Sequence, residues 1–451
     1  MLLSLAGSLA QAQNTTWGFG LPITSNLANG TLTCSVTDPT QGVKTFGQNN
    51  VTLVRNVDGM VAWATATGYG FATYDVNLHN WQSIGANINT AITTLQTAYG
   101  VGAYATNSAY GYVRYNPALR QWATGGASTN SQGAISTNYG VVVWTNGGGA
   151  YGYATYDPAQ AQWKSDGTAG AAGTTIVTQH GVVAWRTNNA YGAAIYNPVL
   201  HQWETQGSAG TMSEMVCDNG VAAWSSSTRY VVAAFSPTLR HWTSTGYAAS
   251  VVANSLQITD GTVSFATSQG AQTLGYGVAT DQWNSNTATT LYCALLPITI
   301  PQSPFVYFHN LSIGASSYSI ACGDGQVIAR RVGWKQYTSS STYAPELTVS
   351  NASITSTCTG TVQVALATQA GQASSLLAPV PNPATGTVLV MLPVGTTQLQ
   401  LLNLLGQAQW EALVPPTKTQ YQVPLAGLAP GAYQLVVQGP AGPISTRLLV
   451  Y

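Results

Sequence analysis

The side chains that could carry out chemistry are few in this sequence. Thirteen acidic residues are spread along 451 residues without forming a close pair of carboxylates at a shared repeat position, which argues against hydrolysis by two paired acids. Glu204, Glu214 and Asp218 lie near one another, but their spacing is more typical of solvated loops. The sequence has no serine-nucleophile pattern G-x-S-x-G, no zinc pattern H-E-x-x-H and no phosphate-binding Walker loop. No catalytic residue is therefore predicted.

The sequence also predicts neither a metal site nor a cofactor. The five cysteines, which show no C-x-x-C spacing, are Cys34, Cys217, Cys293, Cys322 and Cys358. The turns at Asp218-Asn219-Gly220 and Asp324-Gly325 are isolated and lack the further oxygen ligands that calcium requires. We therefore expect the cysteines to be free thiols or disulfides.

Candidate ligand-binding residues come from internal repetition. Tryptophans recur every 39 to 41 residues, and two residues before four of them stand the basic side chains His79, Arg120, His201 and Arg240. Positions that vary between repeats are free to face a ligand, whereas positions filled alike are needed for packing. If these strand ends share one edge, they would gather much of the scarce charge on one surface. The competing interpretation is a solvated edge strand.

The repeat itself combines two aromatic signatures. The repeated tryptophans are Trp81, Trp122, Trp163, Trp203, Trp242 and Trp283, and seven residues earlier stand Tyr74, Tyr115, Tyr156, Tyr196, Phe235 and Tyr276. Between them, Asn, Asp or Ser followed by Pro predicts a tight turn, because the polar side chain bonds the backbone ahead and proline fixes φ. Upstream in each unit a glycine is followed four residues later by an aromatic residue. Each unit therefore predicts four short strands.

Four strands in about forty residues, repeated six times, are typical of a β-propeller blade. We therefore expect an all-β fold with a six-bladed β-propeller over residues 13–295, in which strand-like runs between 17 and 57 are available to close the ring. An open β-solenoid is the alternative. The phrase Tyr-Asp/Asn-Pro followed by Trp resembles the second half of kelch-type blades, although the glycine doublet of that family is missing.

Composition and the N-terminus bear on compartment. Only 6% of the residues are charged and the net charge is zero, so no basic surface is available for nucleic acid. Residues 1–12 contain an apolar run and the small-x-small pattern Ala10-Gln11-Ala12, which predict a signal peptide. No Lys or Arg precedes this run, so the leader is either truncated or atypical, and we favour truncation. No later apolar run is long enough to predict a transmembrane helix.

Residues 300–368 resemble a PKD-type immunoglobulin-like domain. The matching residues are Tyr318, Gly323, Asp324, Gly325, Leu347, Thr348, Val349 and Asn351. Ile320 stands where the family has its core Trp, and Cys322 replaces the Phe before the Gly-Asp-Gly turn. One or two disulfides are expected among Cys293, Cys322 and Cys358 without a fixed pairing, and a Cys322–Cys358 bond would restore what the smaller core loses. In its family such a domain is mostly a spacer or adhesive module.

A linker over residues 369–380 leads to a last domain, residues 381–451, made of alternating strands joined by Gly and Pro turns. It resembles the C-terminal sorting domain of the Bacteroidetes type IX secretion system. The matching residues are Pro381, Asn382, Pro383, Leu404, Gly406, Leu428, Gly431, Tyr433 and Arg447. The resemblance implies that the secretion machinery at the outer membrane is a partner, and that the protein is released or attached to the cell surface. The alternative is an ordinary terminal immunoglobulin-like domain.

Three functions fit this organisation. The first is a noncatalytic secreted or surface binding protein, with glycans as candidate ligands because neutral amides and aromatic rings suit uncharged sugars. The second is an extracellular enzyme acting on polysaccharides or peptides, whose sparse catalytic residues would converge from different blades. The third is an adhesion or structural protein that contacts other surface proteins through flat blade faces. The absence of catalytic motifs favours the first.

Overall fold

The computed structural model describes residues 23–38, 40–76, 78–129, 132–168, 173–300, 303–329, 331–364, 382, 384–392, 396–403, 407–415, 418–439 and 442–450. Within these ranges every regular element is a β-strand, so the expected all-β class is confirmed. The chain divides into two compact units, residues 1–365 and 366–451. The predicted signal peptide and the predicted linker lie outside the described residues.

Each of the six repeats forms one antiparallel sheet of four strands in chain order, as the sequence predicts. The strands of the first three repeats are β4 (Val51–Val57), β5 (Met60–Thr65), β6 (Gly68–Asp75), β7 (Asn80–Asn87), β8 (Thr94–Ala98), β9 (Val101–Ala105), β10 (Ala109–Asn116), β11 (Gln121–Ser128), β12 (Gln132–Asn138), β13 (Val141–Asn146), β14 (Tyr151–Asp157) and β15 (Gln162–Thr168). Those of the last three are β16 (Thr175–Gln179), β17 (Val182–Arg186), β18 (Ala190–Asn197), β19 (Gln202–Ala209), β20 (Glu214–Asp218), β21 (Val221–Ser225), β22 (Arg229–Ser236), β23 (His241–Ala248), β24 (Gln257–Thr259), β25 (Thr262–Thr267), β26 (Gly270–Gly277) and β27 (Gln282–Ser285).

The first turn of each repeat explains the glycine of the upstream signature. In repeat 4, His180 and Gly181 form a two-residue turn between β16 and β17, with φ of 47° and 81°. Two consecutive left-handed residues make the hairpin turn whose twist matches the flanking strands. The glycine is therefore required by its backbone conformation.

The third turn is held by the Asp, Asn or Ser of the repeated phrase. The Oδ1 atom of Asn116 accepts hydrogen bonds from the backbone amides of Ala118 at 2.9 Å and Leu119 at 3.2 Å, and Asp157 binds two amides of its own turn in the same way. The predicted side-chain bond to the backbone ahead is confirmed in these turns. Because the strands run up and down, the first and third turns of every repeat lie at the same edge of its sheet, here called the turn edge.

The repeat tryptophans pack between consecutive sheets. The Trp203 ring centroid lies 5.6 Å from that of Tyr196 in its own repeat and 4.7 Å from that of Tyr153 in the preceding repeat. Its Nε1–H donates to the Lys164 carbonyl of the preceding repeat at 3.1 Å. Trp242 and Trp283 make the same bond one and two repeats later, at 2.9 Å and 3.1 Å. Each such ring therefore joins two sheets by packing and by a hydrogen bond.

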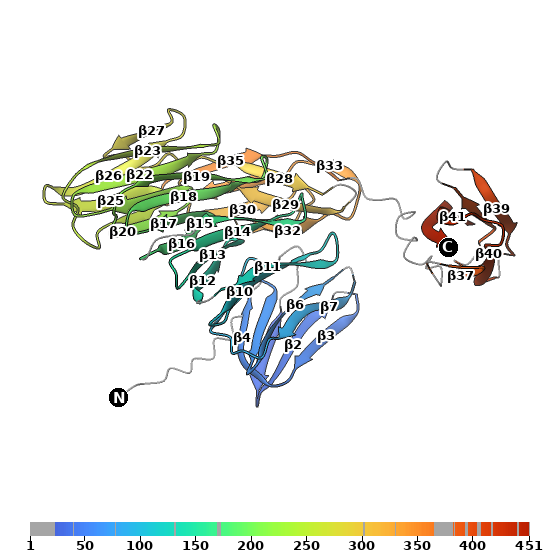
Figure 1. The fold of residues 1–451 in the computed structure, drawn as a ribbon. Helices are drawn as coiled ribbons and strands as arrows, with labels where there is room; N and C mark the ends of the chain where they lie inside the picture. The colour runs from blue at the N-terminus through green and yellow to red at the C-terminus, as the bar shows by residue number, and fades with distance from the viewer. Residues whose placement is uncertain are drawn as a thin grey trace. The chain divides into compact units, whose positions relative to one another are not determined.

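The sheets follow one another in an open row, where the sequence led us to expect a closed ring. The first sheets, in blue, and the sixth, in yellow-green, lie at opposite ends of this row in Figure 1. An additional sheet of β1 (Thr24–Ala28), β2 (Thr31–Asp38) and β3 (Gly42–Gln48) covers the outer face of the first repeat, where Leu32 and Cys34 pack with Val61 and Trp63. That is the face on which a ring would have to receive the sixth repeat.

A smaller module follows the repeats within the same compact unit. Its strands are β28 (Leu295–Thr299), β29 (Phe305–Asn310), β30 (Ser317–Ala321), β31 (Val327–Ile328), β32 (Gly333–Gln336), β33 (Ser341–Tyr343), β34 (Glu346–Ser350), β35 (Thr355–Thr359) and β36 (Val362–Val364). They form sheets in the orders β28-β29-β32, β31-β30-β34-β35 and β33-β36. Ile320 is buried in place of the expected core tryptophan, and Trp334 of β32 is buried as well, so the core of this module has its tryptophan on another strand.

The disulfide of this module joins Cys293 and Cys358, whereas the bond considered from the sequence was Cys322–Cys358. Cys322 is a buried free thiol. Cys322 follows β30, and β34 lies between β30 and β35, which carries Cys358. Neighbouring strands are about 4.8 Å apart, so β30 and β35 are separated by two such spacings. That separation exceeds the usual Cα–Cα distance of a disulfide. Burial raises the pKa of Cys322 to about 11, so this thiol is unreactive at neutral pH.

The second unit is a small sandwich of two sheets. β37 (Thr387–Met391) pairs with β40 (Gln420–Pro424), and the other sheet has the order β39 (Ala408–Leu413), β38 (Gln398–Leu402), β41 (Gly431–Gly439), β42 (Gly442–Val450). Alternate residues of both sheets, such as Val388, Leu399 and Leu435, face a common core.

The described motif residues of this unit lie in β41 and β42 or bond to them. The Asn382 side chain accepts a hydrogen bond from the Leu449 amide at 2.9 Å, and the Tyr433 hydroxyl donates to the Ala429 carbonyl at 2.8 Å. Gly431 begins β41, and Arg447 pairs with Gln434 across β41 and β42. Pro381, Pro383, Leu404 and Gly406 lie outside the described residues.

Candidate functional site

The four predicted ligand-binding residues lie along the turn edge, one in each of repeats 1, 2, 4 and 5, and two of them are paired with carboxylates. His79, Arg120, His201 and Arg240 all occupy the last, left-handed position of a third turn, with φ between 50° and 56°. The Nδ1 atom of His201 lies 2.6 Å from Asp157 Oδ2, and that of His79 lies 2.8 Å from Asp38 Oδ2. Both carboxylates belong to the preceding turn along the row. These two histidines therefore join neighbouring sheets, and a ligand role for the four residues stays a prediction.

Carboxylates of the third turns also bind the repeated tyrosines. The Tyr196 hydroxyl donates to Asp157 Oδ2 at 2.6 Å, and Tyr115 donates to Asp75 Oδ2 at 2.7 Å. Burial and the hydrogen bond to Asp157 raise the pKa of Tyr196, so the phenol stays protonated and can donate. The aspartate at the third turn of one repeat thus cross-links it to the tyrosine of the next repeat.

The Asp38 carboxylate has the most complete set of partners. Burial raises the pKa of Asp38. Hydrogen bonds from His79, from Tyr74 and from the Thr40 amide and hydroxyl lower it by more than burial raises it, so the net pKa lies well below the ordinary value. Asp38 therefore remains ionised as a structural anion. Its donors leave little capacity for an external ligand.

The turn edge is covered by the small module. The guanidinium of Arg114 is buried, and its Cζ lies 5.0 Å from the ring centroid of Tyr307, 5.7 Å from that of Trp334 and 5.6 Å from that of Tyr156. Two of these rings belong to the module and one to the next repeat. Such contacts between a cation and aromatic faces are strengthened by burial. Sequence reasoning missed Arg114, although it is the one charged residue at a position filled by Thr73 and Thr155 in neighbouring repeats.

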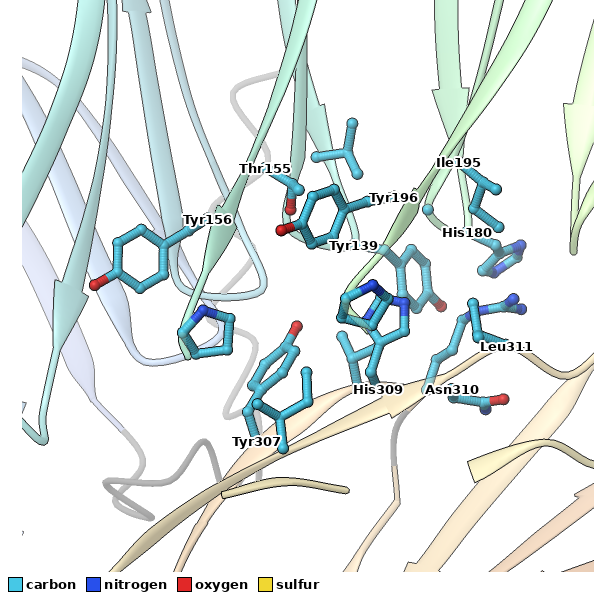
Figure 2. Close-up of a pocket in the computed structure, with 17 residues that line it drawn as sticks. Tyr139, Thr155, Tyr156, His180, Ile195, Tyr196, Tyr307, His309, Asn310 and Leu311 are labelled. Atoms are coloured by element: carbon cyan, nitrogen blue, oxygen red, sulfur yellow. The ribbon is translucent and has the colours of Figure 1, made fainter. Parts of the chain in front are cut away.

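A narrow pocket lies between the turn edge of repeats 3 and 4 and the module. Figure 2 shows Tyr139 and His180 from the repeats facing Tyr307 and His309 of β29. Its cavity volume is about 20 Å³, which accommodates roughly one water molecule. Burial and the neighbouring Arg331 charge lower the pKa of His309 to about 4, so its imidazole is neutral at physiological pH. This pocket is a packed interface rather than an open binding site.

The opposite edge of repeats 4 and 5 carries a wider groove of about 710 Å³. It is formed by the ends of β18, β19, β21, β22 and β23 and by the second turn of repeat 5. Its aromatic residues are Tyr191, Trp224, Tyr230 and Tyr247, and its other side chains are mostly hydroxyl and amide groups such as Ser208 and Gln206. Tyr247 is 64% exposed, which leaves its ring free to contact a ligand.

Most rings of this groove also serve the packing of the repeats. The Tyr191 ring centroid lies 5.3 Å from that of Trp224 in the next repeat, and the Tyr230 ring centroid lies 4.5 Å from that of Phe265. The same pairing joins Tyr69 to Tyr104 in the first two repeats, with 3.7 Å between the ring centroids. These tyrosines are therefore part of the repeat architecture, and they form one wall of the groove.

Two groove residues depart from the repeat pattern. Tyr247 occupies the strand position filled by Ala86, Ala127, Thr168 and Ser208, and Arg229 occupies that of Gly68, Ala109 and Ala190. Comparison of aligned repeats could have found both, since a large side chain replaces a small one at each position. The guanidinium carbon of Arg229 lies 5.4 Å from the Tyr191 ring centroid. Large polar side chains at an open edge, where other repeats need only small ones, mark this groove as the candidate site.

The described part of the chain has no cluster of three His, Cys, Asp or Glu residues arranged to hold a metal ion. It also has no helix long and apolar enough to span a membrane.

Comparisons with known proteins do not assign a family. No family model and no curated protein matches the chain. Among solved structures, Kluyveromyces lactis Hsv2 aligns over 59% of this chain and 94% of its own, with 12% identity and a TM-score of 0.29. The extracellular domain of a putative one-component system from B. thetaiotaomicron aligns over 95% of this chain and 62% of its own, with 11% identity and a TM-score of 0.23. A computationally designed protein, Ika8, aligns over 70% of this chain and 96% of its own, with 12% identity and a TM-score of 0.25. At such scores the alignments assign neither fold nor function.

Proposed function

We propose that this protein is a noncatalytic carbohydrate-binding protein of the cell exterior, and that the groove between repeats 4 and 5 is its binding site. The observation that carries the proposal is the pair Arg229 and Tyr247, which place a cation and an exposed ring where the other repeats have small residues. Sugar rings stack their C–H faces on aromatic side chains, and their hydroxyls pair with amide, hydroxyl and guanidinium groups. The groove offers all of these groups along one edge of two neighbouring sheets.

Export by the type IX secretion system belongs to the same proposal. It is supported by the resemblance of residues 381–451 to the sorting domains of that system and by the signal-like residues 1–12. The PKD-like and kelch-like resemblances support a multidomain exterior protein in which the repeats are propeller-type units and present the groove. The sorting domain would then be removed or used for attachment after transport.

The test is binding of the full 451-residue chain to an array of bacterial, plant and algal glycans, in parallel with Tyr247→Ala. The proposal expects saturable binding to one glycan class and a loss of at least tenfold in affinity in the variant. A matched control is Tyr343→Ala, which removes a tyrosine from the small module. Absence of glycan binding by a folded sample, or equal binding by Tyr247→Ala, would contradict the proposal.

A further inference from the structure

The groove contains one formally charged side chain, and it is a cation. Among its described lining residues, Arg229 is the single charged group and none is Asp or Glu. The chain has 13 basic and 13 acidic residues in 451, so the groove holds one of its few cations and no anion.

Arg229 is held in place without using its full hydrogen-bonding capacity. Its guanidinium carbon lies 5.4 Å from the Tyr191 ring centroid, and Nη2 reaches the Ala209 carbonyl at the long distance of 3.5 Å. No ion pair joins Arg229 to a carboxylate in the described ranges. A guanidinium has five donors in a planar fork, and this contact uses one of them, so donors remain for a ligand.

A fixed planar fork recognises a carboxylate by two parallel hydrogen bonds, and such charged pairs are stronger than neutral ones. Tyr230 and Tyr247, whose ring centroids are 6.1 Å apart, lie beside it as a surface for a sugar ring. A pyranose that carries a carboxylate satisfies both features, because its ring can stack while its acid group reaches Arg229.

On this basis we propose that the groove selects carboxylate-bearing sugars, such as uronic acid units, through Arg229. This inference rests on the proposed carbohydrate-binding function and gives it a ligand class. Polysaccharides with several sulfate or phosphate groups fit less well, because they would need further cations that the groove does not supply.

The experiment measures affinity by titration calorimetry with the full chain. The probes are oligogalacturonate of defined length, its methyl ester, which keeps the sugar but removes the charge, and a sulfated oligosaccharide. Three proteins are compared: the unchanged chain, Arg229→Gln and Arg55→Gln. Arg55 is an exposed strand arginine that bonds the carbonyl of its own neighbour Val54, so its replacement is a matched charge control.

The proposal expects oligogalacturonate to bind at least tenfold more tightly than its methyl ester. Arg229→Gln should remove this preference while keeping weak binding of the ester, and Arg55→Gln should retain it. Equal affinity for acid and ester would overturn the carboxylate inference and leave carbohydrate binding standing. Stronger binding of the sulfated probe would overturn it as well. Absence of binding of all three probes would also overturn the carboxylate inference, whereas the proposed function stands or falls by the glycan array.

Discussion

The two edges of the repeat sheets use polar residues in opposite ways. At the turn edge, Asp157, Tyr196 and His201 bind one another across two repeats, and the small module covers much of that edge. At the groove edge, Tyr247 is mostly exposed, and Arg229 is half-buried against the Tyr191 ring without a carboxylate partner in the described ranges. The comparison shows that repeated polar residues can be structural, whereas polar residues that break the repeat at an open edge are the better candidates for binding.

The largest expected effect concerns the packing between sheets. Trp203→Ala should lower the free energy of unfolding by about 3 to 5 kcal/mol, because it leaves a cavity between repeats 3 and 4 and removes the bond to Lys164. Chemical denaturation monitored by circular dichroism measures this change. An unchanged denaturation midpoint would refute the packing role of the tryptophan.

The next effect concerns the polar cross-link of the turn edge. Asp157→Ala should lower the free energy of unfolding by about 2 to 3 kcal/mol, because it leaves the Tyr196 hydroxyl and two turn amides without an acceptor. Asp157→Asn is the matched control, since Asn116 occupies the same position in repeat 2 and binds Tyr156 at 2.7 Å. If the alanine variant were as stable as the asparagine variant, the cross-link would not matter for stability.

Acid should weaken the turn edge through Asp38. Its pKa is lowered in the folded protein, so its contribution to stability is complete above the unfolded-state value near 4 and is lost as the pH falls below it. Thermal melting between about pH 5 and pH 2 should show a falling midpoint, with a smaller slope in Asp38→Asn. An identical slope in the variant would assign the acid sensitivity to other carboxylates.

The smallest effect on stability is expected at the groove edge. Tyr247→Ala should change the free energy of unfolding by no more than about 0.5 kcal/mol, because the side chain is mostly exposed. Denaturation of this variant beside Trp203→Ala sharpens the contrast between the two edges. A loss of several kcal/mol would mean that Tyr247 is a packing residue like the other tyrosines.

The sequence predicted the local structure of the repeats well. Glycine turns, Asp-Pro turns and recurring aromatics have short-range causes, and they identified four strands in each unit. The open row was not predicted, because ring closure depends on which surface covers the outer face of the first repeat. The Cys293–Cys358 bond was not assigned either, since pairing depends on strand order in the module.

The candidate site was harder to predict. His201 and Arg240 drew attention because basic residues are scarce, yet the acceptor of His201 comes from the preceding repeat and cannot be inferred from spacing. Arg229 and Tyr247 were overlooked because each belongs to a strand pattern that otherwise repeats. Only the structure shows that both lie at an open edge beside the glycines of two neighbouring fourth strands.

The most direct test of the account is hydrogen–deuterium exchange of the full chain with and without a saturating glycan found on the array. The account predicts slower exchange at the ends of β22 and β23, in residues 228–231 and 244–248, with no change in the third turns around residues 117–121 and 198–202. Protection of those turns, with the groove unaffected, would contradict it and transfer the binding site to the turn edge.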